Sequence, residues 1–215
     1  MKKILILLPK GFELLEAAAF TDVFGWARVA FKQKVMTVTC GLNPDKTVRA
    51  SFGDGASVTS GNAVTEQGLK VNCAVSVDEV ISADFEALAL PGGFGRYGYY
   101  EEGFDERVLN LIRDFNTQKK PIASVCTASL LLAKSGILEG KMATTYRHEN
   151  GKFLRQISEL GAVACEEELL VTENIITSSG PATAPKVALK LLEMLTSHET
   201  AQQVLLAMGY GETQR

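Results

Sequence analysis

The stretch "KKPIASVCTASLLLAKSG", residues 119–136, places a short apolar run directly before a run with helical character. A strand is predicted over residues 120–126, because a continuous apolar run of this length is typical of a strand buried on both faces of a sheet. Residues 127–136 are predicted to continue as a helix that Gly136 closes. Together they predict a βα unit of a parallel sheet covered by helices.

The same alternation of apolar runs and helix-period segments runs along the rest of the chain. Further strands are predicted at 2–8, 34–40, 85–93 and 141–146, and further helices at 13–30, 76–82, 104–117, 152–161 and 182–195. Residues 41–68 are predicted as a polar loop with short strand pieces, and residues 162–178 as a β-hairpin that turns near Glu173 and Asn174.

The series predicts one α/β domain over residues 1–215 with a flavodoxin-like, doubly wound sheet. The sheet is expected to be mostly parallel, with helices on both faces. Ligands bind at the carboxyl ends of the strands in such sheets. We therefore expect the functional residues just after Leu8, Leu90, Val125, Tyr146 and Ser178.

Charge and hydropathy argue against several classes of partner. The net charge is −3, with 22 basic and 25 acidic residues, and no Lys/Arg-rich block marks a nucleic-acid or membrane-surface partner. The apolar run at residues 4–8 ends at Pro9 and Lys10 without the cleavage pattern of a secretory signal. The longest uncharged stretch, between Lys120 and Lys134, is shorter than the roughly 18 residues of a membrane span. We therefore expect a cytoplasmic protein that binds neither nucleic acid nor a membrane.

The cysteines and histidines do not form a metal-binding pattern. Cys40, Cys73, Cys126 and Cys165 are widely spaced and include no CxxC, which argues against a zinc site and against a disulfide scaffold. With only two histidines and no clustered carboxylates, we expect no metal and no cofactor.

Cys126 stands where the predicted strand turns into the helix. A lone cysteine in an apolar stretch is commonly a small core residue. The strand-turn-helix order is instead that of a nucleophile elbow, although the usual flanking glycines are missing. In an elbow the sulfur lies near the helix amino terminus, whose N–H groups and dipole favour a thiolate. Both interpretations stay open, and the neighbouring residues favour the nucleophile.

Residues near other strand ends are candidates to support this cysteine. Backbone N–H groups of Gly92, Gly93 and Thr127 are candidate oxyanion donors, although the two glycines also suit a tight strand exit. Glu13 is expected only to complement the dipole of the first helix. Glu16, one turn further in and flanked by apolar residues, is expected to stay protonated and to hydrogen-bond the sulfur.

Three further features have a functional and an ordinary interpretation. "GFGRYG", residues 93–98, matches the dinucleotide-binding pattern, but "YYEEGFDE" separates it from the next predicted helix and it lies in mid-chain. His148 lies where a general base would be placed, although a loop histidine can equally face solvent, and His198 is expected on the surface. Arg96 is a candidate to hold an anionic substrate or is simply an exposed loop residue.

Four ordered motifs give the chain a resemblance to the ThiJ/PfpI family, within the class I glutamine amidotransferase-like superfamily. They are "GFELLE", "LPGGFG", "ASVCTASLLLAKSGILEGKMATTY" and "IITSSGPATAPKVALKLLEML", and the resemblance extends from Lys2 to about Leu195. It implies a flavodoxin-like homodimer with a reactive cysteine at Cys126, a glutamate partner at Glu16 and oxyanion donors at Gly92, Gly93 and Thr127.

The chain departs from this family at the histidine. Many relatives carry histidine at the position of Thr127 or of Tyr146, so the resemblance does not supply a Cys/His/acid triad. Tyr146 and Arg96 are expected to line the substrate pocket. Glu16 fits a glyoxalase- or deglycase-like branch, in which a small reactive carbonyl is the substrate. The alternatives are a redox-sensing or chaperone-like protein with an oxidisable cysteine, and an isocyanide hydratase, amidase or peptidase.

Overall fold

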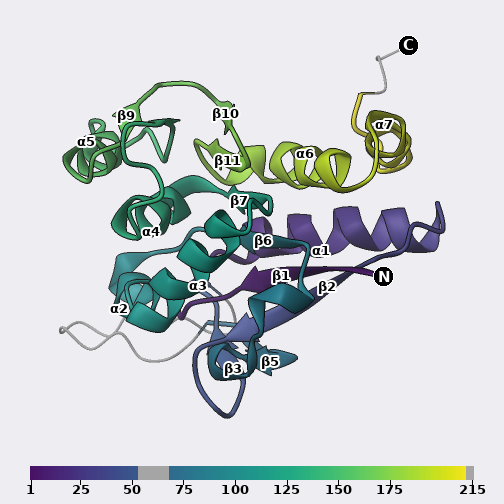
Figure 1. Cartoon of the computed structure of the whole chain (residues 1–215), viewed down its shortest axis with the longest axis horizontal. Helices are drawn as coiled ribbons and strands as arrows, with labels where there is room; N and C mark the ends of the chain where they lie inside the picture. The colour runs from purple at the N-terminus through teal and green to yellow at the C-terminus, as the bar shows by residue number, and fades with distance from the viewer. Residues whose placement is uncertain (53–67, 212–215) are drawn as a thin grey trace.

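The computed structural model describes residues 1–52 and 68–211. A seven-stranded sheet forms its centre, with the strand order β10-β11-β7-β6-β1-β2-β5 (Figure 1). The bounds of these strands are Leu169–Thr172 (β10), Ile175–Ser178 (β11), Ile122–Ser124 (β7), Ala87–Leu90 (β6), Lys2–Leu7 (β1), Val35–Gly41 (β2) and Val75–Ser76 (β5). All neighbouring pairs in this sheet are parallel except β10 and β11.

Apolar runs build the central strands, as their sequence predicts. Residues 4–7 of β1 and all four residues of β6 are fully buried, because helices cover both faces of the sheet. The flavodoxin-like, mostly parallel α/β fold is therefore confirmed.

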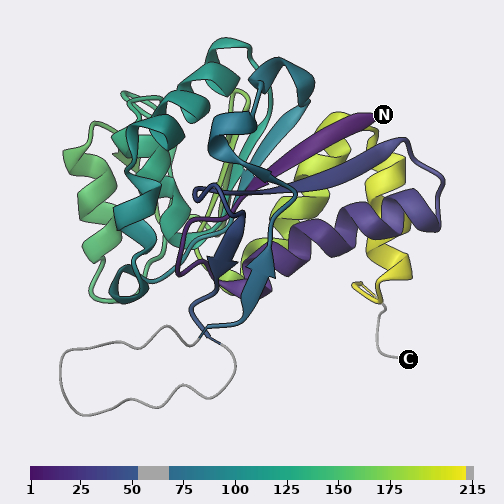
Figure 2. The same cartoon turned by 90° about the horizontal axis from the view of Figure 1, so that it is seen from below.

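The helices form two layers, one on each side of the sheet (Figures 1 and 2). One layer contains α1 (Leu14–Val29), α6 (Ala184–Leu195) and α7 (His198–Ala207), which pack on one another. The other contains α2 (Tyr99–Gly103), α3 (Glu106–Thr117), α4 (Ser129–Lys134) and α5 (Lys152–Glu159). The carboxyl ends of β1, β6 and β7 meet between the layers, and their loops carry the site described below.

Four elements differ from the sequence-based expectation. The strand predicted at 141–146 is only β8 (Met142–Ala143), which pairs with β9 (Val163–Ala164) in a separate two-stranded sheet. The hairpin predicted from residue 162 is therefore shorter and consists of β10 and β11, although it does turn at 173–174. Helix α7 was not predicted. The segment 76–82 contains only a 3₁₀ turn, Val77–Glu79, with a second one at Ser82–Asp84.

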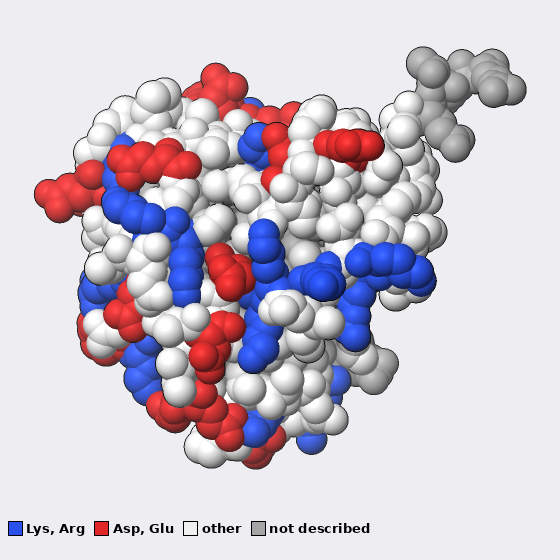
Figure 3. Space-filling view, turned by 45° about the vertical axis from the view of Figure 1, so that its right-hand side comes forward, with Lys and Arg blue, Asp and Glu red and all other residues white. Residues whose placement is uncertain are grey.

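The predicted loop at 41–68 lies partly outside the described residues, and in its described part β3 (Thr47–Arg49) pairs with β4 (Lys70–Asn72). No helix within residues 1–52 and 68–211 is long and apolar enough to span a membrane. Acidic and basic side chains are interspersed on the face shown in Figure 3.

Candidate active site

Cys126 occupies a strained turn between β7 and α4. Val125 is still extended, whereas Cys126 has a φ of 55° in the left-handed region and opens the 3₁₀ turn Cys126–Ala128 that leads into the helix. A non-glycine residue with this φ is uncommon and concentrates at functional sites. The hydroxyl of Thr145 donates to the carbonyl of Cys126 at 2.9 Å and braces the turn. The local geometry is that of a nucleophile elbow.

The turn after β6 packs directly against this elbow, and only glycine fits there. A Cβ atom on Gly92 would lie 2.9 Å from Thr127 Oγ1 and 3.0 Å from Cys126 Cβ. A Cβ atom on Gly93 would lie 2.3 Å from the ring of Tyr99 and 2.4 Å from the carbonyl of Gly11. The two glycines thus allow the backbone to approach the cysteine closely.

Glu16 reaches the same point from α1 and is fully buried. Its Oε2 accepts a hydrogen bond from the Gly92 N–H at 2.5 Å, and the carboxyl also hydrogen-bonds the Cys126 side chain. Burial, reinforced by the nearby charge of Glu13, raises the pKa of Glu16 to about 8. Since Oε2 accepts from an N–H, the carboxyl proton belongs on Oε1, which has no hydrogen-bond partner among the described residues.

The electrostatics of Cys126 differ from the sequence-based expectation. Burial raises the pKa of Cys126 above its ordinary value, and the charge of Glu16, when ionised, raises it further. The N–H of Thr127 hydrogen-bonds the sulfur and acts in the opposite direction. The expected stabilisation of a thiolate by the helix amino terminus is therefore outweighed by burial. Because each charge opposes the other, a thiolate forms only while Glu16 keeps its proton.

The oxyanion donors need one correction. The Gly92 N–H is occupied by Glu16, so Gly92 holds the carboxyl in place and is not a donor to substrate. The Gly93 N–H donates to Thr127 Oγ1 at 3.1 Å, and the same hydroxyl donates to the Gly93 carbonyl at 3.0 Å. Gly93 and Thr127 both line the pocket, so they stay the candidate oxyanion donors, with the Gly93 N–H on Thr127 Oγ1 and the Thr127 N–H on the sulfur in this structure.

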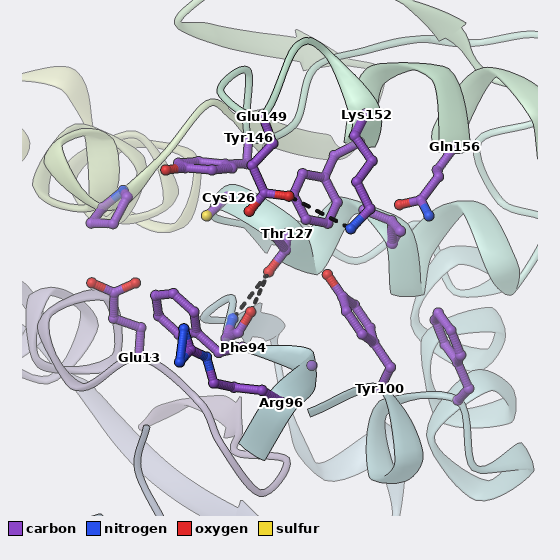
Figure 4. A pocket seen from close by; sticks show the side chains of 16 residues that line it. Glu13, Phe94, Arg96, Tyr100, Cys126, Thr127, Tyr146, Glu149, Lys152 and Gln156 are labelled. Carbon is purple, nitrogen blue, oxygen red and sulfur yellow. Dashed lines mark hydrogen bonds and ion pairs between the residues drawn. The ribbon is translucent and has the colours of Figure 1, made fainter. Parts of the chain in front are cut away.

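A pocket of about 580 Å³ opens beside the cysteine (Figure 4). Its walls come from the loop after β6, from α2, α4 and α5, and from segments next to these helices and to α1. They are formed by Glu13, Gly93, Phe94, Gly95, Arg96, Tyr100, Phe104, Cys126, Thr127, Leu130, Tyr146, Glu149, Lys152, Phe153, Gln156 and Pro181.

Arg96 and Tyr146 belong to the pocket wall, whereas His148 does not. His148 is exposed, and its ring packs on that of Tyr146, with 5.2 Å between the ring centroids. The structure therefore does not bring His148 to Cys126. His198 is exposed at the start of α7, as expected.

Sequence reasoning missed several wall residues. Glu13 was assigned only to the helix dipole, yet it lines the pocket and burial raises its pKa. Tyr100 belongs to α2, a helix that begins directly after "GFGRYG", so residues 99–103 do not form the intervening loop that was expected. Lys152 and Gln156 lie one turn apart on α5. The helical period of that segment predicts that both lie on one face of the helix, but it does not predict that this face meets the pocket.

No group of three or more His, Cys, Asp or Glu side chains able to hold a metal occurs in the described part of the chain. The four cysteines, Cys40, Cys73, Cys126 and Cys165, are free thiols.

Comparison with known proteins identifies the family. The model of the DJ-1/PfpI family matches residues 2–194. The chain belongs to this family. Protein dj-1beta of Drosophila melanogaster is 29% identical over 203 residues, which cover 94% of each chain. The crystal structure of Drosophila melanogaster DJ-1beta superposes with a TM-score of 0.79 at 26% identity and covers 98% of each chain.

Two enzymes of known activity are similar as well. Protein/nucleic acid deglycase 2 of Escherichia coli is 28% identical over 195 residues, covering 90% of this chain and 98% of the enzyme. Isonitrile hydratase of Pseudomonas putida is 30% identical over 167 residues, covering 78% of this chain and 67% of the enzyme. DJ-1/PfpI relatives thus include enzymes with different substrates.

Proposed function

We propose that the protein is a cysteine-dependent, cofactor-free enzyme that acts on small reactive carbonyls or their adducts, as in glyoxalase or deglycase chemistry. The observation that carries the proposal is the contact between Cys126, in a pocket wall, and a buried carboxyl with a raised pKa. A neutral acid beside a nucleophilic sulfur can both donate a proton and later accept one. Similarity to protein/nucleic acid deglycase 2 supports this choice.

The steps balance without an external oxidant or reductant. The thiol of Cys126 first loses its proton to water while Glu16 stays protonated. The resulting thiolate forms a bond to the aldehyde carbon, C1, and the carbonyl oxygen takes the proton of Glu16 to give a hemithioacetal. The Glu16 carboxylate then removes the hydrogen on C1 as a proton and returns it to C2, while the proton of the C1 hydroxyl moves to the C2 oxygen. C1 is thereby oxidised to a thioester carbonyl, and C2 is reduced to a carbon that carries a hydroxyl group. Water releases the resulting thioester as a 2-hydroxy acid, and the thiol is restored. The N–H groups of Gly93 and Thr127 stabilise the oxygen anion.

Turnover of methylglyoxal by Cys126→Ser tests this proposal. We expect kcat/KM to fall at least about 100-fold, because serine is a far weaker nucleophile in the absence of a histidine base. Cys165→Ser is the matched control, since Cys165 is a free thiol outside the pocket wall, and it should match the wild type. Full turnover by Cys126→Ser would refute the proposal.

A second candidate function is redox sensing through Cys126. It is favoured by Glu16 Oε1. This buried atom has no hydrogen-bond partner within the described part of the chain, and when protonated it can donate a hydrogen bond to a sulfinate oxygen on Cys126. Mild peroxide should then add two oxygen atoms selectively to Cys126, as measured by mass spectrometry of the intact protein and its peptides. Equal oxidation of Cys165 would count against the sensor.

We further propose that the chain forms a homodimer through α1. Leu15, Trp26 and Val29 on this helix are 60%, 43% and 70% exposed, which is unusual for large apolar side chains of one helix. Trp26→Glu should yield a monomer in analytical ultracentrifugation, whereas an unchanged dimer would place the interface elsewhere.

A further inference from the structure

The last step of the proposed reaction needs a base that activates water. Water must attack the carbonyl carbon of the thioester on Cys126, and a side chain that takes a proton from it speeds such a step by roughly 100- to 10,000-fold. Histidine is the commonest base of this kind, but His148 lies outside the pocket wall. Glu16 is fully buried, and its Oε2 already accepts the Gly92 N–H. The base is therefore to be sought among the other wall residues.

Two carboxyl groups line the pocket within the described residues, those of Glu13 and Glu149. Glu149 pairs with Lys152 at 3.5 Å and points toward it (Figure 4). Burial raises the pKa of Tyr100 and of Tyr146, so both hydroxyls keep their protons at neutral pH and are not bases. The side chain of Glu13 has no hydrogen bond or ion pair in the described part of the chain. Glu13 is thus the wall carboxyl that is available to bind a water molecule.

The backbone holds Glu13 beside the cysteine. Its N–H donates to the Gly92 carbonyl at 2.8 Å, and a Cβ atom on Gly92 would lie 3.0 Å from Cys126 Cβ, so one residue separates the two backbones here. The Glu13 carboxyl lies on the same side of the pocket as the Cys126 sulfur (Figure 4). Although Glu13 is the N-cap residue of α1, its side chain makes no capping hydrogen bond. The carboxyl therefore serves the pocket and not the end of the helix.

The surroundings of Glu13 suit it to accept a proton. Burial raises its pKa, but the residue is only partly buried, so it ionises at lower pH than Glu16, whose pKa burial and the charge of Glu13 raise to about 8. A carboxylate with a raised pKa is a stronger base than an exposed one. The groups that face it are Glu16, Cys126, Tyr146 and Arg96 (Figure 4). At neutral pH Glu16 and Tyr146 keep their protons and acylated Cys126 is uncharged, so Arg96 carries the remaining charge and favours the Glu13 carboxylate.

We propose that Glu13 is the general base that activates water to hydrolyse the Cys126 thioester. Its carboxylate takes one proton from a water molecule while the oxygen of that water forms a bond to C1. The bond between C1 and the sulfur then breaks, and Glu13 gives the proton to the departing sulfur. The products are the 2-hydroxy acid, the Cys126 thiol and the Glu13 carboxylate, so the step consumes only water. This inference rests on the proposed carbonyl chemistry at Cys126.

Glu13→Gln tests this role, because it keeps the size of the side chain and removes the base. With methylglyoxal, kcat should fall about 100-fold while kcat/KM changes less than about threefold, since the thioester forms before the base is needed. Peptide mass spectrometry during turnover should find most of the variant with a hydroxylamine-labile adduct on Cys126. Glu13→Asp keeps a carboxylate and should recover about tenfold in kcat. Glu199→Gln, at the first turn of α7 and outside the pocket wall, is the matched control and should behave as the wild type.

The pH dependence gives a readout that a merely structural role would not change. Between pH 5 and 7 the rate at which Glu13→Gln loses its adduct should rise about tenfold per pH unit, because hydroxide replaces the base, whereas the wild-type rate should level off once Glu13 is ionised. Wild-type kcat without accumulated adduct in Glu13→Gln would overturn the inference. Equal losses of kcat and kcat/KM without adduct would also overturn it, because Glu13 would then act before the thioester forms. Failure of the proposed function is distinct, since turnover would then survive Cys126→Ser.

Discussion

Neutralising Glu16 should remove much of the pH dependence of the protein's stability. In Glu16→Gln the amide oxygen can still accept the Gly92 N–H, and the amide N–H can still donate to the sulfur. The variant therefore preserves the shape and hydrogen bonds of the site while it removes only the titration. A change in pH dependence can then be assigned to the buried carboxyl.

The magnitude follows from the raised pKa. Because the folded-state pKa of about 8 lies above the ordinary value of 4.5, the folded state holds the proton more tightly, and stability is lost as pH rises between these values. At about 1.36 kcal/mol per pKa unit, the whole contribution is roughly 5 kcal/mol. Between pH 5.0 and 7.5 the wild type should lose about 3 kcal/mol of stability through Glu16, and Glu16→Gln should not.

Urea denaturation followed by circular dichroism at pH 5.0 and 7.5 measures this difference. The free energy of unfolding of Glu16→Gln should rise relative to the wild type by about 3 kcal/mol over this interval. Glu159→Gln is the matched control, because this carboxyl on α5 is exposed, and it should follow the wild type. Parallel stability curves for Glu16→Gln and the wild type would refute the assignment of a buried neutral carboxyl at residue 16.

Three further substitutions test the surroundings of the site. Gly93→Ala should destabilise the protein by about 2–3 kcal/mol in urea denaturation, because its Cβ would collide with the ring of Tyr99 at 2.3 Å; a loss below about 0.5 kcal/mol would contradict this packing. Tyr99→Phe should cost about 1–3 kcal/mol in the same assay, since the buried hydroxyl donates to the Pro91 carbonyl at 2.6 Å, and unchanged stability would count against that bond. His148→Ala should retain methylglyoxal turnover within about twofold, because His148 lies outside the pocket wall. A 100-fold loss of turnover would show that His148 takes part in the reaction.

The sheet was predictable from the sequence because its central strands are buried on both faces. A short, continuous apolar run such as residues 4–8 has no polar side to turn toward solvent, so it fits a strand in the middle of a covered sheet. The strand predicted at 141–146 shows where this reasoning fails. Its threonines look like strand residues, but Thr145 braces Cys126 and the Thr144 N–H donates to Thr177 Oγ1. Helix α7 carried a usable signal in Ser197, whose side chain caps it. The prediction of one domain over residues 1–215 remains a prediction.

The centre of the site was easier to predict than its walls. Cys126, Glu16 and the glycines after β6 each follow a strand end, so the topology of a parallel sheet brings them together. The partners of each N–H could not be predicted, and Gly92 therefore received the wrong role. Glu13 was missed because an acidic residue at the first turn of a helix is already accounted for by the helix dipole. Lys152 and Gln156 reach the pocket only through the tertiary placement of α5.

The most direct test of nucleophilic catalysis by Cys126 is the identity of the residue that carries the reaction intermediate. Wild-type protein is mixed with methylglyoxal, quenched in acid within one turnover and analysed by peptide mass spectrometry. We predict an adduct with the mass of one methylglyoxal on Cys126 that hydroxylamine removes, as expected of a thioester. Turnover that proceeds with Cys126 unmodified, or with the labile adduct on Cys165, would contradict the proposed mechanism.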